Sequence, residues 1–285
     1  MHKSGFVNII GNPNVGKSTL MNALVGEKLS IITSKAQTTR HRIMGIVSGE
    51  DFQIVYSDTP GILKPSYKLQ ESMMKFVTGA VTDADVILYV TDTVEQGDRS
   101  AEIIGRIRES GIPTVVVINK IDLSTPEALD ALVDKWRQEL PEAQIVPASA
   151  KENFNIEGLF KTILALLTEG PAFYPKETLT DKTLRFFASE IIREKILKFY
   201  DKEIPYCCEI EIDSYREEPT IDRIAATIYV ARDSQKGILI GHKGEKLKRV
   251  GQTAREDMEE FLGKKVFLQL FVKVSDDWRN NERQL

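Results

Sequence analysis

Short apolar runs alternate with longer amphipathic stretches up to about residue 168. Each apolar run is followed by a polar loop and then by residues with helical spacing, which is typical of strands in a parallel, doubly wound sheet with crossover helices. The predicted strands are Phe6–Ile10, Gln53–Ser57, Val86–Thr91, Thr114–Ile118 and Ile145–Pro147, with an added strand at Arg42–Ser48. The predicted helices include Ser18–Val25, Arg99–Ser110, Ala128–Leu140 and Ile156–Leu167.

The pattern changes at Glu169–Lys176, where two prolines and a glycine interrupt any helix and indicate a linker. We therefore divide the chain into a domain at residues 1–170, a linker at 171–182 and a second domain at 183–285. The second domain is predicted to be a compact α+β unit with a helix, two strands, a helix, a glycine-bearing turn, a helix and a strand. Its longer elements are Thr183–Tyr200, Cys207–Tyr215, Arg223–Ala231, Lys246–Leu262 and Lys265–Val274.

Composition is consistent with an ordinary soluble chain of two domains. The 285 residues are 42% hydrophobic and 28% charged, and 38 Lys and Arg against 42 Asp and Glu give a net charge of −4. This negative net charge argues against binding of nucleic acid over the whole surface, although the net charge of the chain does not show where local basic patches lie. The adjacent Cys207 and Cys208 cannot form a disulfide framework. We expect a cytoplasmic protein, because no apolar run reaches the ~20 residues of a spanning helix and the start of the chain leaves no room for a cleavable signal.

The loop after the first apolar run carries a phosphate-binding pattern. Gly11–Ser18 fits G-x-x-x-x-G-K-[ST] between a predicted strand and a predicted helix. Its backbone N–H groups can point at a polyphosphate, Lys17 can reach the β and γ phosphates, and Ser18 can ligate Mg²⁺. The alternative is a glycine-rich turn without a ligand. The predicted phosphate-binding residues are Gly11, Asn12, Pro13, Asn14, Val15, Gly16, Lys17, Ser18 and Thr19.

Two later segments indicate which base is bound. A carboxylate at Asp122, in Asn119-Lys120-Ile121-Asp122, can accept hydrogen bonds from guanine N1–H and the 2-amino group, a pair that adenine does not offer. In Ser149-Ala150-Lys151 the Ala150 N–H can meet the guanine oxygen. In this order the motifs resemble the base-reading motifs of the small GTP-binding proteins. The predicted guanine-binding residues are Asn119, Lys120, Asp122, Ser149, Ala150 and Lys151.

Asp58-Thr59-Pro60-Gly61 ends another apolar run and predicts contacts with the γ-phosphate. Asp58 would hold Mg²⁺ through a water, and the Gly61 N–H would sense the phosphate; a turn aspartate without a ligand is the alternative. The resemblance favours Thr39 as the switch threonine, because the family places it directly before an arginine. Residues 64–67 and their neighbours would form a second mobile switch. The predicted Mg²⁺ ligands are Ser18, Thr39 and Asp58 through water, and the switch residues are Thr38, Thr39, Asp58, Thr59, Pro60 and Gly61.

One residue of the Ras-like pattern is missing. Ras-like proteins place a glutamine after the D-x-x-G glycine to orient the attacking water, and this chain has Ile62. We therefore expect slow intrinsic hydrolysis or another orienting group. Asn14 belongs to a pattern that bacterial relatives pair with K⁺ near the phosphates, and K⁺ could supply positive charge there. A loop-capping role for Asn14 is an equal alternative.

The second domain carries a Gly-x-x-Gly turn after an apolar helical segment, at Gly237–Gly244. The flanking glycines allow a phosphodiester chain to approach, while bases lie on an apolar groove. An ordinary helix–turn–helix corner is the alternative, but the order of elements resembles a KH domain in its bacterial, type II arrangement. The predicted RNA-binding residues are Gly237, Ile238, Ile240, Gly241, His242, Lys243, Gly244, Lys246, Lys248 and Arg249, and Leu239 would pack or line the groove.

Together the motifs resemble the Era family over the whole chain. The resemblance implies a P-loop NTPase domain, α/β with a doubly wound and mostly parallel sheet, followed by a smaller α+β KH domain. It also implies GTP, GDP and Mg²⁺ as ligands, hydrolysis of GTP, and binding of the single-stranded 3′ end of 16S rRNA during assembly of the 30S subunit. Some members associate with the inner membrane, but no basic amphipathic helix here indicates it. We expect a monomer.

Two other functions stay open at this point. A P-loop nucleotide kinase would need an adenine pocket and a lid, and the guanine motifs argue against it. An RNA-binding scaffold that keeps GTP as a structural ligand is harder to dismiss, because Ile62 stands where Ras-like proteins have the glutamine that orients the attacking water. In the switch hypothesis, Thr39 and Gly61 are held by the γ-phosphate and Mg²⁺, and the linker transmits their ordering to the KH domain.

Overall fold

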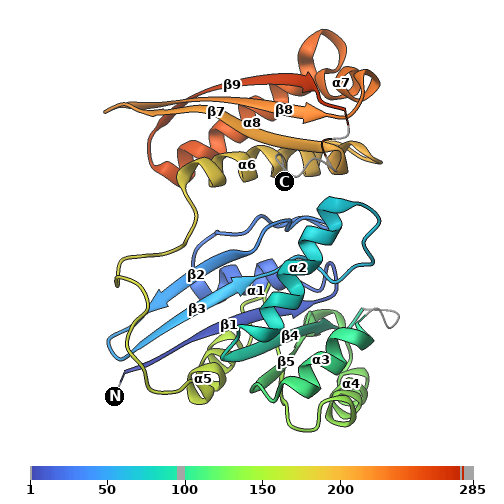
Figure 1. Ribbon diagram of the computed structural model, residues 1–285, viewed down its shortest axis with the longest axis vertical. Coiled ribbons are helices and arrows are strands. Elements are labelled where there is room, and N and C mark those ends of the chain that lie inside the picture. The colour runs from blue at the N-terminus through green and yellow to red at the C-terminus, as the bar shows by residue number, and fades with distance from the viewer. Residues whose placement is uncertain (1, 95–99, 277, 279–285) are drawn as a thin grey trace. The chain divides into compact units, whose positions relative to one another are not determined.

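Residues 2–94, 100–276 and 278 are described by a computed structural model, in which the chain divides into two units (Figure 1). The first unit ends at Asp181 and the second begins at Lys182. Each unit has its own sheet and its own buried core, so each is described separately.

A six-stranded sheet forms the centre of the first unit, in the order β2-β3-β1-β4-β5-β6. Only β2 is antiparallel to its neighbour, and the other pairs are parallel. The mostly parallel, doubly wound sheet predicted from the apolar runs is therefore confirmed. The strands are β1 (Lys3–Gly11), β2 (Ile43–Ser48), β3 (Phe52–Asp58), β4 (Val86–Asp92), β5 (Thr114–Asn119) and β6 (Gln144–Pro147).

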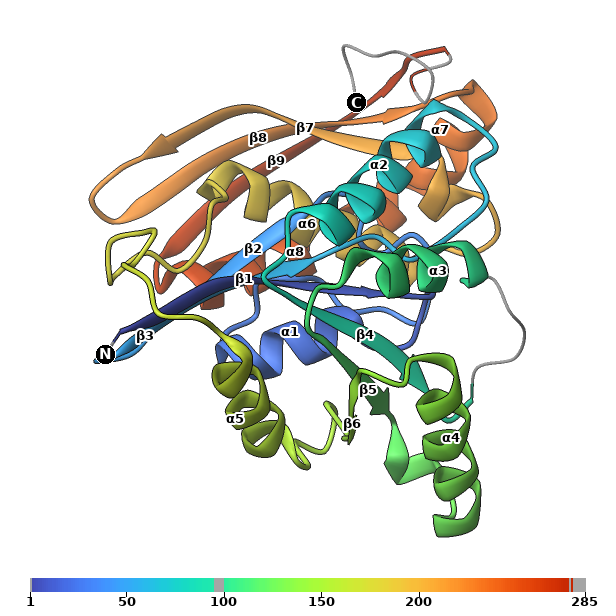
Figure 2. The same ribbon diagram turned by 60° about the horizontal axis from the view of Figure 1, so that its bottom comes forward.

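Helices cover both faces of this sheet, as right-handed crossovers on either side of β1 require (Figure 2). Side chains of α2, α3 and α4 share one core cluster with β1, β4 and β5, while α1 packs against β1 and β3 and contacts α5. The helices are α1 (Lys17–Val25), α2 (Lys68–Thr82), α3 (Ala101–Ser110), α4 (Pro126–Glu139) and α5 (Ile156–Leu166), with a 3₁₀ turn η1 at Ile121–Leu123.

Two helices of the first unit differ from the prediction. Helix α2 was not predicted from the sequence, because residues 64–67 and their neighbours were assigned to a mobile switch; its Leu69, Met73, Val77 and Ala80 are buried at helical spacing. The predicted helix at Arg99–Ser110 begins at Ala101 in the structure, and Arg99 lies outside the described residues.

The carboxyl ends of the parallel strands lie along one edge of the sheet. β1 sits between β3 and β4, and the connections that leave β1 and β3 run to opposite faces. Ligands of open α/β sheets bind at such a point, because the loops diverge and leave a crevice. The loops after Gly11, Asp58, Asp92 and Asn119 all begin at this edge.

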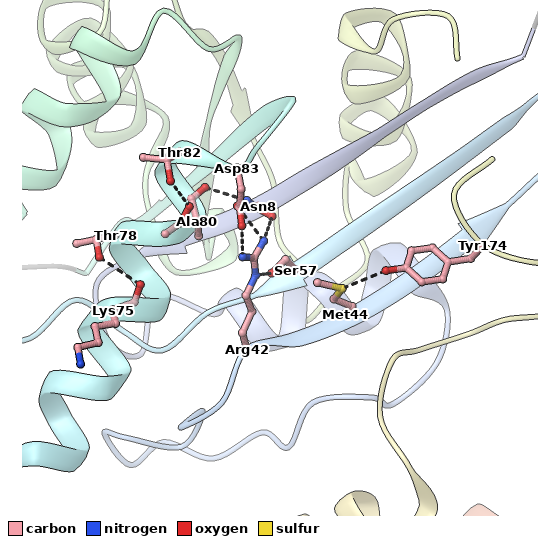
Figure 3. Close-up of polar contacts among 11 residues, drawn as sticks. Asn8, Arg42, Met44, Ser57, Lys75, Thr78, Ala80, Thr82, Asp83 and Tyr174 are labelled. Atoms are coloured by element: carbon pink, nitrogen blue, oxygen red, sulfur yellow. Dashed lines mark hydrogen bonds and ion pairs between the residues drawn. The ribbon is translucent and has the colours of Figure 1, made fainter. Parts of the chain in front are cut away.

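The segment between the last helix of the first unit and Lys182 contacts β1 and β3 and then, at Leu179–Asp181, follows the edge strand β2. The Ile46 N–H donates to the Leu179 carbonyl at 2.8 Å, the Thr180 hydroxyl donates to the Met44 carbonyl at 2.7 Å, and Asp181 accepts from the Met44 N–H at 3.1 Å. Figure 3 shows the Tyr174 hydroxyl beside the Met44 sulfur, 3.8 Å away. Residues 171–181 are therefore attached to the first unit and are not a free tether.

A three-stranded sheet organises the second unit, in the order β7-β8-β9. β7 and β8 are antiparallel with a bulge between Ile212 and Ser214, and β8 and β9 are parallel. The predicted order of helices and strands is confirmed: α6 (Leu184–Phe199), β7 (Cys208–Glu217), β8 (Ile221–Val230), α7 (Asp233–Ile240), α8 (Glu245–Leu262) and β9 (Lys265–Val274), with 3₁₀ turns η2 (Ile204–Tyr206) and η3 (His242–Gly244).

The core of the second unit lies between this sheet and the helices on one of its faces. It includes Ile192 and Ile196 of α6, Ile228 of β8, and Val250 and Ala254 of α8, all completely buried. Both cysteines are buried and form no disulfide, so they pack as small apolar side chains. Among the described residues, no helix combines the length and the apolar character that crossing a bilayer requires.

Candidate functional site

The loop between β1 and α1 curls around the ammonium group of Lys17. The buried Nζ atom donates to the carbonyls of Gly11 at 3.0 Å and Asn12 at 2.7 Å. Gly16 has φ +94°, and a Cβ at this position would lie 2.3 Å from the Asn119 amide nitrogen. The loop therefore requires glycine at Gly16 for its backbone conformation and for the close approach of Asn119.

Asn119, the last residue of β5, joins two of the predicted loops. Its amide nitrogen donates to the Val15 carbonyl at 2.8 Å, and its amide oxygen accepts from the Ala150 N–H at 3.0 Å. The side chain is only 2% exposed. Asn119 therefore positions the phosphate loop and the Ser149–Lys151 loop against each other.

Lys120 contacts the phosphate loop from the other side. Its Nζ atom donates to the Asn14 carbonyl at 2.6 Å and pairs with the Asp92 carboxylate at 2.5 Å. Asp92 is a functional candidate that was not predicted from the sequence, and it is 5% exposed. Its position directly after a predicted strand, at the same edge of the sheet as Asn119, is the feature of the sequence that could have identified Asp92 as a candidate.

The predicted base-reading carboxylate is accessible. Asp122 is exposed in η1, and its Oδ1 accepts from the Ser149 hydroxyl at 2.6 Å. Ala150 is buried, with its N–H directed to Asn119. Lys151 is exposed and pairs with Glu152 at 3.2 Å. The structure thus brings Asn119, Asp122 and the Ser149–Lys151 loop together, as the sequence predicts.

A hydroxyl–carboxylate cluster lies at the start of α1. The Ser18 hydroxyl donates to Asp58 at 2.7 Å and lies 2.9 Å from the Thr39 hydroxyl, which is 3.4 Å from the same carboxylate oxygen. The Thr38 hydroxyl instead donates to the Lys35 carbonyl at 2.6 Å. The geometry therefore favours Thr39 over Thr38 as the switch threonine, in line with the sequence-based preference.

This cluster fits Mg²⁺. Asp58 is completely buried, and its second carboxylate oxygen has no hydrogen-bond donor among the described residues. Burial raises the pKa of the Asp58 carboxyl, while the Ser18 hydrogen bond and the charge of Lys17 oppose that rise. A buried carboxylate with an unused oxygen beside two hydroxyls provides the hard oxygen ligands that Mg²⁺ prefers.

The residues after Asp58 differ in their surroundings: some lie in the protein interior, and one lies against the phosphate loop. The Thr59 hydroxyl donates to the Ile9 carbonyl at 2.7 Å in the interior, and the assignment of Thr59 to the γ-phosphate region stays a prediction. A Cβ at Gly61 would lie 2.8 Å from the Pro13 Cα, so only glycine fits against the phosphate loop. Ile62 is 4% exposed and packs in the core with α2, turned away from the site.

A cavity of about 430 Å³ lies beside the phosphate loop, and its volume is typical of small-ligand sites. It is lined by the phosphate loop from Pro13 to Thr19, by residues 31–39 around Thr39, and by Gly61, Lys120 and Lys151. Asn14 lines it with a left-handed backbone (φ 65°), a conformation that asparagine tolerates. Both the loop-capping role of Asn14 and its role beside K⁺ stay predictions.

Arg42 links the residues after Thr39 to the end of α2 (Figure 3). Its guanidinium donates to both carboxylate oxygens of Asp83 at 2.5 and 3.0 Å, to the Asn8 amide oxygen at 2.9 Å and to the Ser57 hydroxyl at 2.5 Å. Asn8 in turn donates to the Ala80 carbonyl at 2.8 Å. This network was not predicted from the sequence, because its members are far apart in the chain.

The Gly-x-x-Gly turn of the second unit lies between α7 and α8. Gly241 and Gly244 have φ values of 75° and 81°, and Lys243 between them has φ 49°. His242, Lys243, Lys246 and Lys248 are exposed, and the Arg249 guanidinium lies 4.3 Å from the centre of the Phe199 ring. Gly237 and Ile238 are exposed and Ile240 is half-buried, whereas Leu239 is completely buried and belongs to the core.

Known proteins match the chain over its whole length. A family model described as "50S ribosome-binding GTPase" matches residues 6–120, and one described as "KH domain" matches residues 203–279. GTPase Era of Alkaliphilus metalliredigens is 45% identical over 289 residues, covering 100% of this chain and 97% of the relative. The chain belongs to the Era family of GTPases.

Other Era proteins agree with this assignment. GTPase Era of Staphylococcus haemolyticus is 45% identical over 281 residues, covering 98% of this chain and 94% of the relative. A crystal structure of Era in complex with MgGDPNP and nucleotides 1506–1542 of 16S ribosomal RNA has a TM-score of 0.96 at 40% identity, covering 100% of this chain and 97% of that chain. Aquifex aeolicus Era bound to GDP and AlF4⁻ gives a TM-score of 0.95 at 40% identity, covering 99% and 97%.

Proposed function

We propose that this protein hydrolyses GTP, binds the single-stranded 3′ end of 16S rRNA through its KH unit and assists assembly of the 30S subunit. The observation that carries the proposal is full-length similarity to an Era protein whose structure holds both MgGDPNP and 16S rRNA nucleotides. The cavity and loops described above supply groups suited to each part of such a nucleotide.

Each residue of the site has a task in this function. Lys17 and the phosphate-loop N–H groups bind the polyphosphate, and Asp122 selects guanine over adenine. Ser18, Thr39 and Asp58 would hold Mg²⁺, which when bound neutralises charge on the phosphate oxygens. The Gly61 N–H would contact the γ-phosphate. K⁺ near Asn14 and peripheral contact with the inner membrane remain predictions from the resemblance, and the cytoplasmic location and a monomeric state also remain predictions.

Hydrolysis is tested by single-turnover release of phosphate from GTP, with and without K⁺ and RNA. Release that K⁺ or RNA accelerates supports a catalysed reaction in which another group replaces the missing glutamine. The buried side chain of Ile62 cannot orient a water molecule, so this measurement also tests the rival function. No release under any condition would favour the scaffold that holds GTP as a structural ligand.

RNA binding is tested by the fluorescence anisotropy of a labelled 3′-terminal 16S rRNA oligonucleotide, with a non-hydrolysable GTP analogue and with GDP, at one stated salt concentration. Tighter binding with the analogue is expected. Equal affinity in the two nucleotide states would refute the coupling, because a ligand with equal affinity for both states shifts no equilibrium.

Contacts within the first unit offer a physical route by which the bound nucleotide could influence RNA affinity. Thr39 lies four residues before β2, and β2 holds Thr180 and Asp181 through the backbone of Met44. A displacement of the Thr39 segment would therefore act on the residues that lead directly into the second unit. Asp181→Ala removes the acceptor of the Met44 N–H without touching the nucleotide cavity.

We expect Asp181→Ala to reduce the difference in RNA affinity between the GTP-analogue and GDP states, with GTP affinity unchanged. Asp51→Ala, at an exposed turn on the same sheet, is the matched control. An unchanged difference in the Asp181 variant would show that the β2 contact does not carry the coupling.

A further inference from the structure

The last strand of the second unit presents an unusual exposed face. Along β9, Val266, Leu268, Leu270 and Val272 point to the core, while the alternate residues point away from it. Phe267 is 43% and Phe271 49% exposed. The exposed residues of β9 are Lys265, Phe267, Gln269, Phe271 and Lys273.

This face is open in the described part of the unit. The long helices α6 and α8 lie on the other side of the sheet, as the ribbon views show (Figures 1 and 2). β9 is an edge strand that pairs with β8, where Ala225 lies opposite Gln269 and Thr227 opposite Phe271. Ala225 and Thr227 are small and leave the Phe271 ring accessible, whereas Arg223 lies opposite Phe267 and Tyr229 lies opposite Lys273.

The charges on this face are divided between its strands. Lys265 and Lys273 are exposed at the two ends of β9, and Arg223 of β8 lies 5.5 Å from the Phe267 ring. Arg223 also forms an exposed pair with Glu218 at 3.0 Å. The acidic residues Glu211 and Asp213 of β7 border the same face, and Asp213 accepts a hydrogen bond from the Thr227 hydroxyl at 2.8 Å. Basic side chains therefore flank the aromatic residues along β9 and at Arg223, with Lys265 also paired with Glu259 at 3.3 Å, and the acidic side chains lie along the β7 border of the face.

We propose that the outer face of β8 and β9 is a second binding surface for single-stranded RNA, with bases stacked on Phe267 and Phe271. The two rings are four residues apart on one strand, a separation of about 13 Å. Gln269 between them can donate and accept hydrogen bonds at a base edge, and Lys265 and Lys273 can contact phosphates.

The pattern favours RNA over a protein partner. A docking site for an apolar protein surface would need a continuous apolar area, whereas here each phenylalanine is separated from the next by a polar residue. Aromatic rings with interleaved polar and basic side chains bind single strands, because every base has a face that can stack. This surface goes beyond the proposed function, since it lies on the face of the sheet opposite the core helices and does not include the Gly241–Gly244 turn.

The test measures binding of a labelled 3′-terminal 16S rRNA oligonucleotide to the full chain with a non-hydrolysable GTP analogue. The double variant Phe267→Leu and Phe271→Leu keeps the apolar area but removes the stacking faces. We expect it to weaken binding by about fivefold or more, and Phe271→Trp to retain affinity. Phe261→Leu, at an exposed phenylalanine of α8, is the matched control and should bind as the wild type does.

A second readout locates the RNA. With 4-thiouridine in the oligonucleotide, crosslinks to β9 are expected in the wild type and in a variant with Gly241→Asp and Gly244→Asp. In addition, Lys273→Gln should lower the slope of log affinity against log salt by roughly 0.7, the value for one phosphate contact of a single strand.

The outcomes separate the two proposals. Unchanged RNA affinity in the double leucine variant, together with loss of binding in the Gly241 and Gly244 variant, would overturn the second surface and leave the proposed function intact. Reduced self-association of the double leucine variant in sedimentation, with unchanged RNA affinity, would identify the face as a contact between copies and would also overturn it. Loss of affinity in the leucine variant with no effect of the glycine changes would instead contradict the proposed role of the KH turn.

Discussion

Replacing Asn119 by alanine should loosen the guanine site and the phosphate loop together. The substitution leaves the buried Val15 carbonyl without its 2.8 Å donor and the Ala150 N–H without its 3.0 Å acceptor. An unpaired buried backbone group costs about 1–3 kcal/mol, so the two groups together cost about 2–6 kcal/mol if no water reaches them. A loss of about 2 kcal/mol in the bound state alone corresponds to about thirtyfold weaker binding.

The measurement is a fluorescence titration with a labelled GDP, combined with hydrogen exchange of the Ala150 amide. In Asn119→Ala, we expect about thirtyfold weaker GDP binding and faster exchange at Ala150, because its acceptor is gone. Gln138→Ala, at an exposed position of α4, is the matched control and should change neither. Unchanged exchange at Ala150 and unchanged GDP affinity in the Asn119 variant would refute the argument that this side chain holds the two loops together.

Three further predictions concern single functions of the site. Asp122→Asn should lower guanine affinity and admit xanthine nucleotides, and retained preference for GTP in a competition titration would refute the assignment. Asp58→Asn should stabilise the nucleotide-free protein at neutral pH and should remove Mg²⁺-dependent GTP binding. Burial raises the pKa of Asp58 above its value in the unfolded chain, which is about 3.9. The ionised carboxylate therefore lowers the stability of the folded protein as the pH rises above that value. Thermal unfolding from about pH 4 upward checks this, and equal pH dependence in the two proteins would contradict it. Gly241→Asp with Gly244→Asp should abolish RNA binding at the turn while GTP hydrolysis without RNA persists, as filter binding and phosphate release would show.

Much of the nucleotide site could be predicted because its requirements are local. A curled loop that directs N–H groups at phosphate needs glycine at fixed spacing, and Gly16 with φ +94° meets that need. The apolar runs predicted the sheet, because strands buried on both faces are continuously apolar. Gly11, Asp58 and Asn119 each directly follow a predicted strand, and the structure places them at one edge of the sheet, because parallel strands end on the same side.

Helix α2 shows where local patterns were insufficient. Its apolar residues have helical spacing, but they follow the D-T-P-G motif, and the expectation of a mobile switch took precedence over the periodicity. Thr59 makes a contact that the motif did not predict. Its hydroxyl donates to the Ile9 carbonyl, because a buried hydroxyl must find a partner.

The sequence by itself determined the fold class, and it predicted the division into two domains, the phosphate loop, a base-reading role for Asp122 and the Gly-x-x-Gly turn. Only the tertiary structure decided that Asp92 holds Lys120, that Arg42 joins Asp83 and Asn8, and that Leu179–Asp181 follow the edge of β2. The physical reason is distance along the chain. The conformation of a loop depends on residues that are neighbours in the sequence, so a local pattern can predict it. The contacts named above form between residues from 28 to more than 100 positions apart, and only the packing of strands and helices brings such residues together.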